Sequence, residues 1–344
     1  MAASLSGLTL GSMVVVAAIP HPPGGVPPLE TTPVTACQQA AVSTDRQWLS
    51  AGITPVGSPQ VTSMATRALL DLHLSTRPDG AVIAGWHNRW EYSWPRDSSW
   101  AAVALAYTGH AGDSLRVLRF LQQMQLKSGT WAARYWPDGS GPVDDGRPAE
   151  LDANGWVPWA VWCWSVEESH ESESAEPQLA RLWPMVEAAA DATVRSLSPD
   201  DLPAASMDYW ESSVQVTLST AAALLTGLRA AADIAGELGH ETSAAQWARA
   251  ASRLADGITA GFGRYGAETA FFALSDAETG HRQQASQLLT WFATHTTRLG
   301  TLPEKVDARG QPVSAAPLAW TDAAVLLTLV AQAHRLPVVP IPAR

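Results

Sequence analysis

Two tryptophans, a tyrosine, a glutamate and an adjacent Arg–Asp pair lie within eight residues, Trp90–Asp97, which read WEYSWPRD. Flat aromatic side chains beside a bidentate donor and a carboxylate suit a sugar ring. The apolar face of a pyranose stacks on indole, and its hydroxyls form directional hydrogen bonds with charged groups. The alternative is a buried aromatic cluster with an ion pair at the surface. The candidate binding residues in this segment are Tyr92, Trp94, Arg96 and Asp97.

Two glutamates stand out by their context: Glu211 follows Trp210 before an apolar stretch, and Glu304 lies in Leu-Pro-Glu-Lys before the last such stretch. Paired carboxylates across a sugar-sized gap are the machinery of glycoside hydrolysis, and one of them must be held protonated. An apolar neighbour such as Trp210, or a nearby negative charge such as Asp208, would do this for Glu211. Lys305 instead favours the ionised form of Glu304. The alternative for either glutamate is a charge that complements a helix dipole.

The chain has 344 residues, enough for one large domain or two ordinary ones. Hydrophobic residues make up 46% and charged residues 16%, which allows a large core. The formal net charge is −11 and there is no stripe of Lys and Arg, which argues against nucleic acid or an anionic membrane as the main partner. Ten of the sixteen tryptophans gather at 86–100, 131–136 and 156–164, which indicates a lined cavity.

The two cysteines, Cys37 and Cys163, lie in no zinc-ligand spacing, and we expect no metal or organic cofactor. The apolar segment Leu8–Ile19 is too short to span a bilayer, so no stable membrane span is expected. No Lys or Arg precedes this segment, and a signal-peptide core, a strand or a packed segment are all compatible with it. The sequence therefore leaves the compartment open between cytoplasm and export, and it does not fix the oligomeric state.

Pro20–Pro33 holds six prolines and two glycines, which predicts an extended linker. Beyond it the pattern is helical almost throughout, and Ser58-Pro59 forms a helix start with a capping hydroxyl. We predict an N-terminal arm at 1–57, a helical barrel domain at 58–336 and a tail at 337–344. The predicted helices are 59–76, 97–109, 113–126, 155–168, 178–197, 215–236, 241–261, 267–277, 281–298 and 318–334.

These predicted helices are of two kinds. Four are apolar nearly all round, and a helix of that kind must be surrounded by other helices; most of the others carry their charges along one face. The two kinds alternate for most of the chain, which predicts two concentric layers, an (α/α) toroid; an ordinary multi-helix bundle is the alternative. In a toroid the loops that lead into the inner helices gather at one end, and here those loops hold most of the Trp, Gly, Pro and carboxylate residues. The apolar helices are 97–109, 155–168, 215–236 and 318–334.

Several ordered blocks between about Val61 and Val330 together resemble glycoside hydrolase family 15, the glucoamylase-like enzymes. Each block is similar to a family motif, with Glu150 close to the position where glutamine is common. The resemblance implies an (α/α)6 barrel of the six-hairpin glycosidase type, an inverting mechanism and an α-glucoside substrate, oligosaccharide or disaccharide. The blocks are Tyr92–Asp97, Gly146–Asp152, Tyr209–Glu211, Leu302–Lys305 and Pro317–Trp320.

The same resemblance implies roles for single residues. Arg96 and Asp97 would grip the hydroxyls of the non-reducing glucose. Glu211 would be the general acid and Glu304 the general base that activates water, with carboxyl groups about 6.5–9.5 Å apart. Glucose would be released from an α-glucan, an isomalto-oligosaccharide or trehalose. The further substrate-binding residues expected from the motifs and from their stacking surfaces are Tyr92, Trp94, Asp152, Trp156, Trp210 and Trp320.

The chain departs from the family pattern in one place. A six-hairpin barrel needs twelve helices and we predict ten, with the shortfall near Gly263–Glu268. The absent part usually includes a substrate-contacting arginine, a role that we do not assign to Arg264. We therefore expect an incomplete ring. The alternative to an active hydrolase is a catalytically impaired relative that binds carbohydrate or is structural only.

Overall fold

The computed structural model describes residues 36–171, 175–209, 211, 213–262, 274, 277, 282–306, 310–333 and 336. The chain divides into two units, Met1–Val42 and Ser43–Arg344, and the architecture below is that of the second unit. The predicted apolar segment and proline-rich linker, Leu8–Ile19 and Pro20–Pro33, lie outside the described residues.

The described residues contain ten α-helices. Nine of them lie within a few residues of predicted helices, whereas most of the predicted helix 267–277 lies outside the described residues. The predicted helix start at Ser58 is confirmed, because its hydroxyl accepts a hydrogen bond from the Val61 amide. The helices are α1 (Ala36–Ala51), α2 (Pro59–Ser75), α3 (Pro95–Tyr107), α4 (Ala111–Met124), α5 (Ala153–Glu171), α6 (Ala175–Ser196), α7 (Leu218–Glu237), α8 (Glu241–Phe262), α10 (Arg282–Thr294) and α11 (Ala319–Ala333).

Helix α1 lies inside the stretch for which we had predicted no helix. Its second half carries Trp48, whose ring stacks on His73 and His110 at centroid distances of 4.1 and 3.7 Å. The indole nitrogen of Trp48 also donates to Asp113 at 2.6 Å. These partners lie far from Trp48 in the sequence, so the pattern of residues within the segment does not predict the helix.

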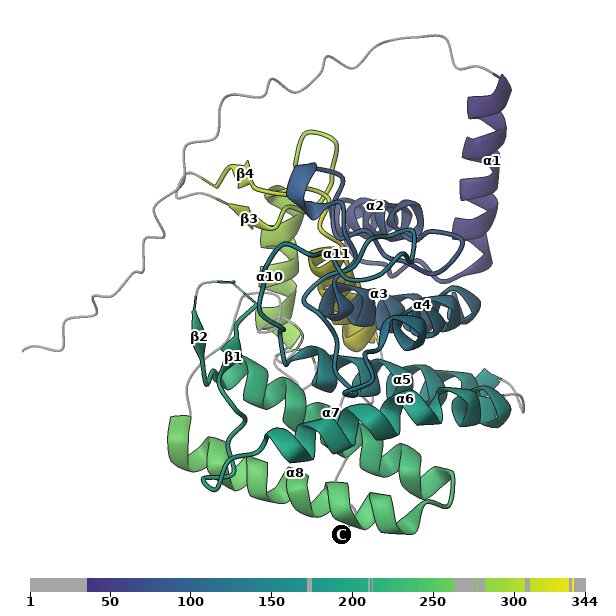
Figure 1. Cartoon of the computed structure of the whole chain (residues 1–344). Coiled ribbons are helices and arrows are strands. Elements are labelled where there is room, and N and C mark those ends of the chain that lie inside the picture. The colour runs from purple at the N-terminus through teal and green to yellow at the C-terminus, as the bar shows by residue number, and fades with distance from the viewer. Residues whose placement is uncertain are drawn as a thin grey trace, which may run out of the picture. The chain divides into compact units, whose positions relative to one another are not determined.

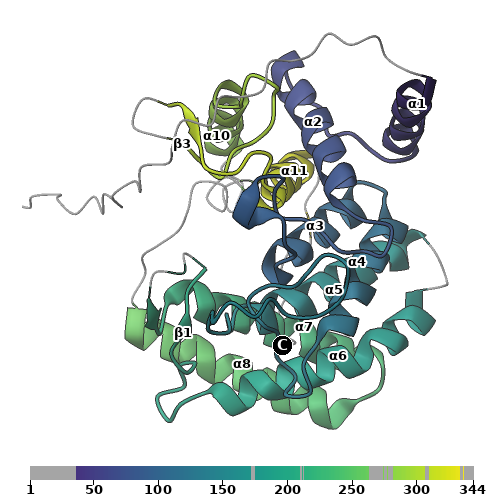
Figure 2. The same cartoon turned by 45° about the horizontal axis from the view of Figure 1, so that its top comes forward.

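The helices form the two layers that the alternating pattern predicted (Figures 1 and 2). All thirteen residues of α3 are buried, and eleven of the 15 residues of α11 are buried. By contrast, only six of the 14 residues of α4 are buried, on one face of the helix. The inner helices pack in the order α11, α3, α5 and α7, while α4, α6 and α8 cover α3, α5 and α7 from outside, and α2 and α10 cover α11.

Among the described helices, the inner layer runs from α11 through α3 and α5 to α7. The stretch near Gly263–Glu268, where we predicted the shortfall, lies outside the described residues. Helix α7 is long and apolar enough to meet a length-and-composition criterion for crossing a membrane. It packs extensively against α5 and α8, however, and a helix enclosed by other helices is expected to be apolar on most sides.

The loops that enter the inner helices are tied to one another, as the toroid predicts. Isolated β-bridges join Ser93 to Tyr135 and Glu150 to Met207, and the Ala319 amide donates to the Ala84 carbonyl. Two short antiparallel hairpins stiffen the last two loops. Strands β1 (Ser206–Met207) and β2 (Val214–Gln215) precede α7, and β3 (Lys305–Val306) and β4 (Pro312–Val313) precede α11.

Candidate active site

A buried guanidinium joins two of the sequence blocks. Arg96, in the first turn of α3, donates from Nη1 to Glu150 Oε2 at 2.5 Å and to Asp152 Oδ2 at 3.2 Å. Its Nε lies 3.6 Å from Asp97 Oδ2. Arg96 is 7% exposed and Asp97 is 3% exposed, so this ion pair is not at the surface. Glu150 and Asp152 are buried as well.

Two of the carboxyl groups around this guanidinium, those of Asp97 and Glu150, have raised pKa values. Burial raises the pKa of Asp97 to about 6; Arg96 opposes this rise, whereas the charges of Asp152 and Glu304 add to it. Burial likewise raises the pKa of Glu150 to about 7, against the attraction of Arg96. A protonated Glu150 has a hydrogen-bond donor as well as an acceptor.

We call Arg96, Asp97, Glu150 and Asp152 the Arg96 group, and this group has polar atoms without a hydrogen-bond partner among the described residues. Among the described residues, no hydrogen-bond partner reaches Arg96 Nε, Glu150 Oε1 or Asp152 Oδ1, and all three atoms are buried. Buried polar atoms are almost always satisfied by protein, water or ligand. Donors and acceptors in one place are suited to the hydroxyls of a sugar.

Aromatic rings close over this group. The Arg96 guanidinium lies 5.2 Å from the centre of the Trp320 ring and 5.8 Å from that of Tyr209, and these two rings meet edge-on at 5.5 Å. Trp156 is connected to Trp320 through Trp100, whose ring lies 5.3 Å from Trp156 and 6.5 Å from Trp320. The blocks before α3, α5, α7 and α11 therefore meet at Arg96.

Two other predicted aromatic residues, Tyr92 and Trp94, belong to the segment that precedes Arg96. Trp94 is 3% exposed and packs between Trp90 at 5.7 Å and Tyr92 at 6.1 Å. Tyr92 is half-buried. Trp210, the expected apolar neighbour of Glu211, lies outside the described residues.

Glu211 lies in the turn between β1 and β2 with a positive φ of 54°. Its amide donates to the Asp208 carbonyl at 2.9 Å. Left-handed backbone at a residue other than glycine is strained and is often found at active sites. The Glu211 carboxylate contacts the Arg147 guanidinium, whose Nε also lies 2.9 Å from Asp145 Oδ2.

The Arg147 contact was not predicted. A cation in contact with a carboxylate favours its ionised form, whereas the sequence had suggested a protonated Glu211 beside Trp210 and Asp208. Arg147 belongs to the Gly146–Asp152 block, but nothing in the sequence joins it to a residue 64 positions later.

Glu304 is held by the last hairpin. Its amide donates to the Ala315 carbonyl at 2.8 Å, and its carboxylate accepts from the Ser314 hydroxyl. The Leu318 amide donates to the Leu302 carbonyl at 3.1 Å, which fixes the entry into α11. The negative charge of Glu304 contributes to the raised pKa of Asp97.

Sequence reasoning also missed Arg134, which is 6% exposed. Its guanidinium lies 4.2 Å from the centre of the Tyr92 ring and 5.3 Å from that of Trp94, and it pairs with Asp145. Although desolvation opposes it, hydrogen bonds from Arg134 and Arg147 lower the pKa of Asp145. A chain of contacts therefore runs from Glu211 through Arg147, Asp145 and Arg134 to Tyr92.

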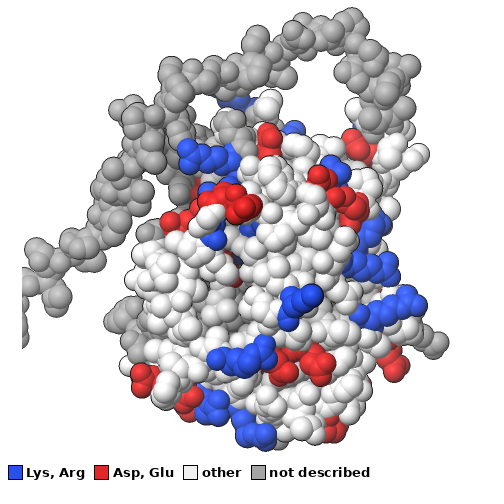
Figure 3. All heavy atoms as spheres, in the orientation of Figure 1, with Lys and Arg blue, Asp and Glu red and all other residues white. Residues whose placement is uncertain are grey.

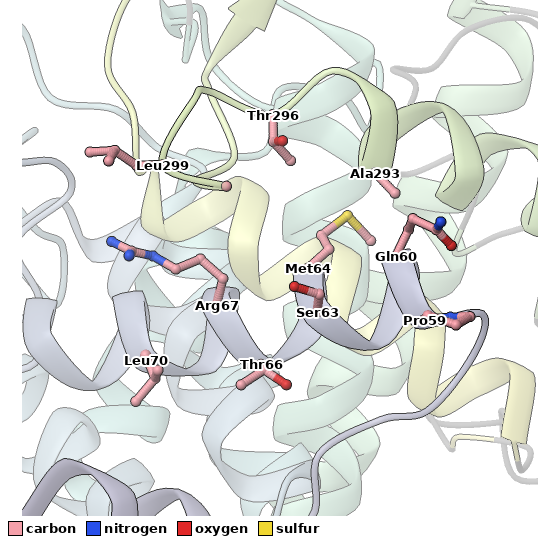
Figure 4. A pocket seen from close by; sticks show the side chains of 11 residues that line it. Pro59, Gln60, Ser63, Met64, Thr66, Arg67, Leu70, Ala293, Thr296 and Leu299 are labelled. Atoms are coloured by element: carbon pink, nitrogen blue, oxygen red, sulfur yellow. The ribbon is translucent and has the colours of Figure 1, made fainter. Parts of the chain in front are cut away.

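Other features of the described surface lie apart from this group. A groove of about 660 Å³ between α2 and the end of α10 is lined by Met64, Arg67 and Leu299, among others, and by none of the predicted site residues (Figure 4). Acidic and basic side chains are interspersed on the face shown in Figure 3, and much of that face is uncharged.

Comparisons with known proteins show which proteins share this fold. No family model matches the sequence. An uncharacterised glycosyl hydrolase of Methanocaldococcus jannaschii is 23% identical over 192 residues, which cover 55% of this chain and 29% of the relative. The match thus spans less than a third of the relative's length.

Several solved structures share the fold of this chain over most of its length. A glycosidase in complex with glucose has a TM-score of 0.66 at 17% identity, covering 83% of this chain and all of that one. A bacterial glucoamylase complexed with acarbose has a TM-score of 0.64 at 14% identity, covering 86% and 58%. The glucoamylase of Saccharomycopsis fibuligera has a TM-score of 0.63 at 13% identity, covering 80% and 96%. The chain therefore has the helical toroid fold of the glucoamylase-type glycosidases.

Proposed function

We propose that this chain is an inverting, exo-acting glycoside hydrolase that releases glucose from the non-reducing end of an α-glucoside. The observation that carries the proposal is the convergence of four sequence blocks on Arg96. Its guanidinium holds Glu150 and Asp152, lies beside Asp97 and is covered by Tyr209 and Trp320. The fold shared with known glycosidases supports it.

In the proposed reaction, Arg96 and Asp97 hold the hydroxyls of the terminal glucose. Glu211 gives its proton to the glycosidic oxygen as the bond to the anomeric carbon breaks. Glu304 takes a proton from a water molecule, whose oxygen bonds to the anomeric carbon from the opposite face, so the configuration inverts. The Glu304 carboxylate then carries the proton that Glu211 lost, and exchange with solvent restores both groups.

One contact favours a second candidate, a relative that binds carbohydrate without turnover. The Arg147 guanidinium lies on Glu211 and favours its ionised form, which is the wrong form for a general acid. In the active enzyme, the carboxyl group of Glu211 would leave Arg147 when the glycosidic oxygen is present.

The test is hydrolysis of maltose, isomaltose and trehalose by the purified chain, followed by NMR that resolves the anomers. The proposal predicts immediate release of β-glucose. Glu211→Gln and Glu304→Gln should each lower the rate by at least about a hundredfold, the lower end of what a general acid or base contributes. Glu241→Gln, an exposed residue of α8, serves as the control.

Several results would contradict the proposal. Release of α-glucose would exclude inversion, and activity that survives Glu211→Gln would remove the assigned acid. Binding of these sugars without turnover would favour the second candidate.

A further inference from the structure

Four charged side chains of alternating sign lie in contact with one another, and the proposed general acid is the last of them. Glu211 contacts the Arg147 guanidinium. Arg147 Nε lies 2.9 Å from Asp145 Oδ2, and the same oxygen pairs with Arg134 Nη2. We call Glu211, Arg147, Asp145 and Arg134 the ion-pair chain. When all four side chains are ionised their charges cancel, so removal of one charge changes the potential at the other three.

The Arg147 guanidinium is shared between two carboxylates. Its Nη1 contacts Glu211 Oε2, whereas its Nε donates to Asp145 Oδ2 at 2.9 Å. The Arg147 amide also donates to Asp145 Oδ1, at 3.3 Å. Because opposite charges offset one another, the carboxylate of Asp145 reduces the positive potential that Arg147 imposes on Glu211.

The position of Asp145 is fixed by a buried arginine. Arg134 is 6% exposed and donates to the Arg89 carbonyl at 3.1 Å. The loop that carries Asp145 is tied to the same segment, because the Val143 amide donates to the Arg134 carbonyl at 3.1 Å. The contacts that hold Asp145 therefore do not depend on the proposed general acid.

The Asp145 carboxylate is also held in its ionised form. Burial opposes ionisation, but hydrogen bonds from Arg134 and Arg147 outweigh it and lower the pKa of Asp145. Asp145 consequently keeps its negative charge at neutral and alkaline pH, where a general acid would lose its proton.

The Glu211 end of the ion-pair chain is fixed through its backbone. The Glu211 amide donates to the Asp208 carbonyl, and the residue has a positive φ. Among the described residues, the structure thus places two charged residues next to Glu211: Arg147 from the loop before α5 and Asp208 from its own turn. The side chains of Arg147 and Glu211 are 25% and 32% exposed, so the scale of a partly exposed ion pair applies.

We propose that Asp145 is a positioning residue for the proposed reaction and acts on Glu211 through Arg147. By sharing the guanidinium, Asp145 limits how strongly Arg147 favours the ionised form of Glu211. This inference rests on the proposed function, in which Glu211 must hold a proton before the glycosidic bond breaks. Asp145 itself takes no part in bond cleavage.

The experiment measures kcat/KM for maltose and isomaltose against pH in the wild type, Asp145→Asn and Asp145→Glu. Asparagine keeps an acceptor for Arg147 but removes the charge, so Arg147 acts more strongly on Glu211. The basic limb should move to lower pH, and kcat/KM on that limb should fall about two- to fivefold, the scale of such an ion pair. Asp145→Glu retains the charge and should recover most of the wild-type value. Asp144→Asn, the exposed neighbour, is the control.

Two further comparisons distinguish this role from a merely structural one. The basic limb of kcat should move less than that of kcat/KM, because kcat reports the complex, in which Glu211 has left Arg147 for the glycosidic oxygen. In the Arg147→Gln background, Asp145→Asn should shift the limb by less than it does in the wild type, since the residue through which Asp145 acts is gone.

Three results would overturn the inference while leaving the hydrolase proposal intact. One is an unshifted basic limb in Asp145→Asn. The second is a shift to higher pH, which would mean that Asp145 mainly presses Arg147 onto Glu211. The third is an equal fall of the rate at every pH, which would indicate general damage to the loop.

If the wild type hydrolyses neither sugar, the hydrolase proposal fails, and the effect of Asp145 on Glu211 is tested alone. Carbon-13 NMR of protein labelled at the glutamate side-chain carboxyl groups follows the titration, and Glu211→Gln assigns the signal of Glu211. A lower titration midpoint for Glu211 in Asp145→Asn supports the inference. An unchanged or higher midpoint overturns it.

Discussion

Gly155 of α5 and Gly227 of α7 bring the backbones of two inner helices into direct contact. A Cβ atom added to Gly227 would lie 2.5 Å from the Gly155 Cα, and one added to Gly155 would lie 2.1 Å from the Ala223 carbonyl oxygen. No side chain fits between the helices at this crossing. The close approach explains why the contacting face of α7 carries alanines and glycine in place of larger residues.

Gly227→Ala should therefore destabilise the fold. The added methyl group meets backbone that cannot move aside, and overpacking of this kind costs about 1–3 kcal/mol. The melting temperature of Gly227→Ala should be lower than that of the wild type by at least a few degrees. Gly236→Ala, in the same helix, is the matched control because nothing lies within 4 Å of its added Cβ. It should stabilise the helix by about 0.5–1 kcal/mol, and equal shifts for both variants would refute the contact.

Glu150→Gln should change how stability depends on pH. The pKa of Glu150 rises from 4.5 to about 7 on folding, mainly through burial, so the folded state holds its proton more tightly than the unfolded chain. This contribution is complete below pH 4.5 and is lost as the pH rises through about 7. At about 1.4 kcal/mol per pH unit, its upper limit is about 3 kcal/mol.

The glutamine variant lacks this titration, so its free energy of unfolding should exceed that of the wild type increasingly between pH 5 and 8. Denaturant unfolding across that range measures the difference. Glu241→Gln, at an exposed position, is the control. A flat difference for Glu150→Gln would show that its carboxyl group ionises normally in the folded protein.

Asp322→Asn should stabilise the protein at neutral pH. Asp322 is 1% exposed on α11, and among the described residues neither carboxyl oxygen has a hydrogen-bond partner. Burial and the nearby charge of Asp71 raise its pKa well above the ordinary value, against the attraction of Arg67. The wild type therefore loses stability as the pH rises above about 4.

The melting temperature of Asp322→Asn should exceed that of the wild type by a few degrees at pH 7.5 and by less at pH 4.5. Differential scanning calorimetry at the two pH values makes the comparison. Asp200→Asn, at an exposed position, is the control. A lower melting temperature for Asp322→Asn at pH 7.5 would mean that the carboxylate has a stabilising partner.

Arg147→Gln should move the pH–rate profile of the proposed hydrolase. The guanidinium favours loss of the proton from Glu211, so its removal should shift the basic limb to higher pH. Arg181→Gln, on the exposed side of α6, should leave the profile in place. An unshifted basic limb for Arg147→Gln would indicate that Arg147 does not act on the general acid.

The two-layer architecture could be predicted because full burial of a helix shows directly in its composition. Helices α3 and α11 contain few charges, and both lie wholly in the inner layer. Helix α1 could not be predicted in this way, since Trp48 packs on residues from other helices.

Part of the candidate site could also be predicted from the sequence, and part could not. The sequence blocks assigned Arg96, Asp97 and Asp152 to substrate binding, which stays a prediction; the structure places both carboxyl groups beside the Arg96 guanidinium. The contacts of Arg147 with Glu211 and of Arg134 with Tyr92 could not be predicted, because they depend on how loops far apart in sequence pack. In the sequence, Glu150 stood out only because glutamine is common near its position. Its raised pKa could not be predicted, because it results from burial of the side chain.

The packing of α11 against α2 and α3 also bears on synthesis of the chain. The Ala319 amide donates to the Ala84 carbonyl, so the end of the domain completes a core begun more than two hundred residues earlier. At about 5–20 residues per second, a ribosome needs roughly 10–40 s to reach α11 after finishing α3. Throughout that interval the apolar surface of α3 lacks its final cover, and a nascent chain at this stage is a natural client for chaperones that shield hydrophobic segments.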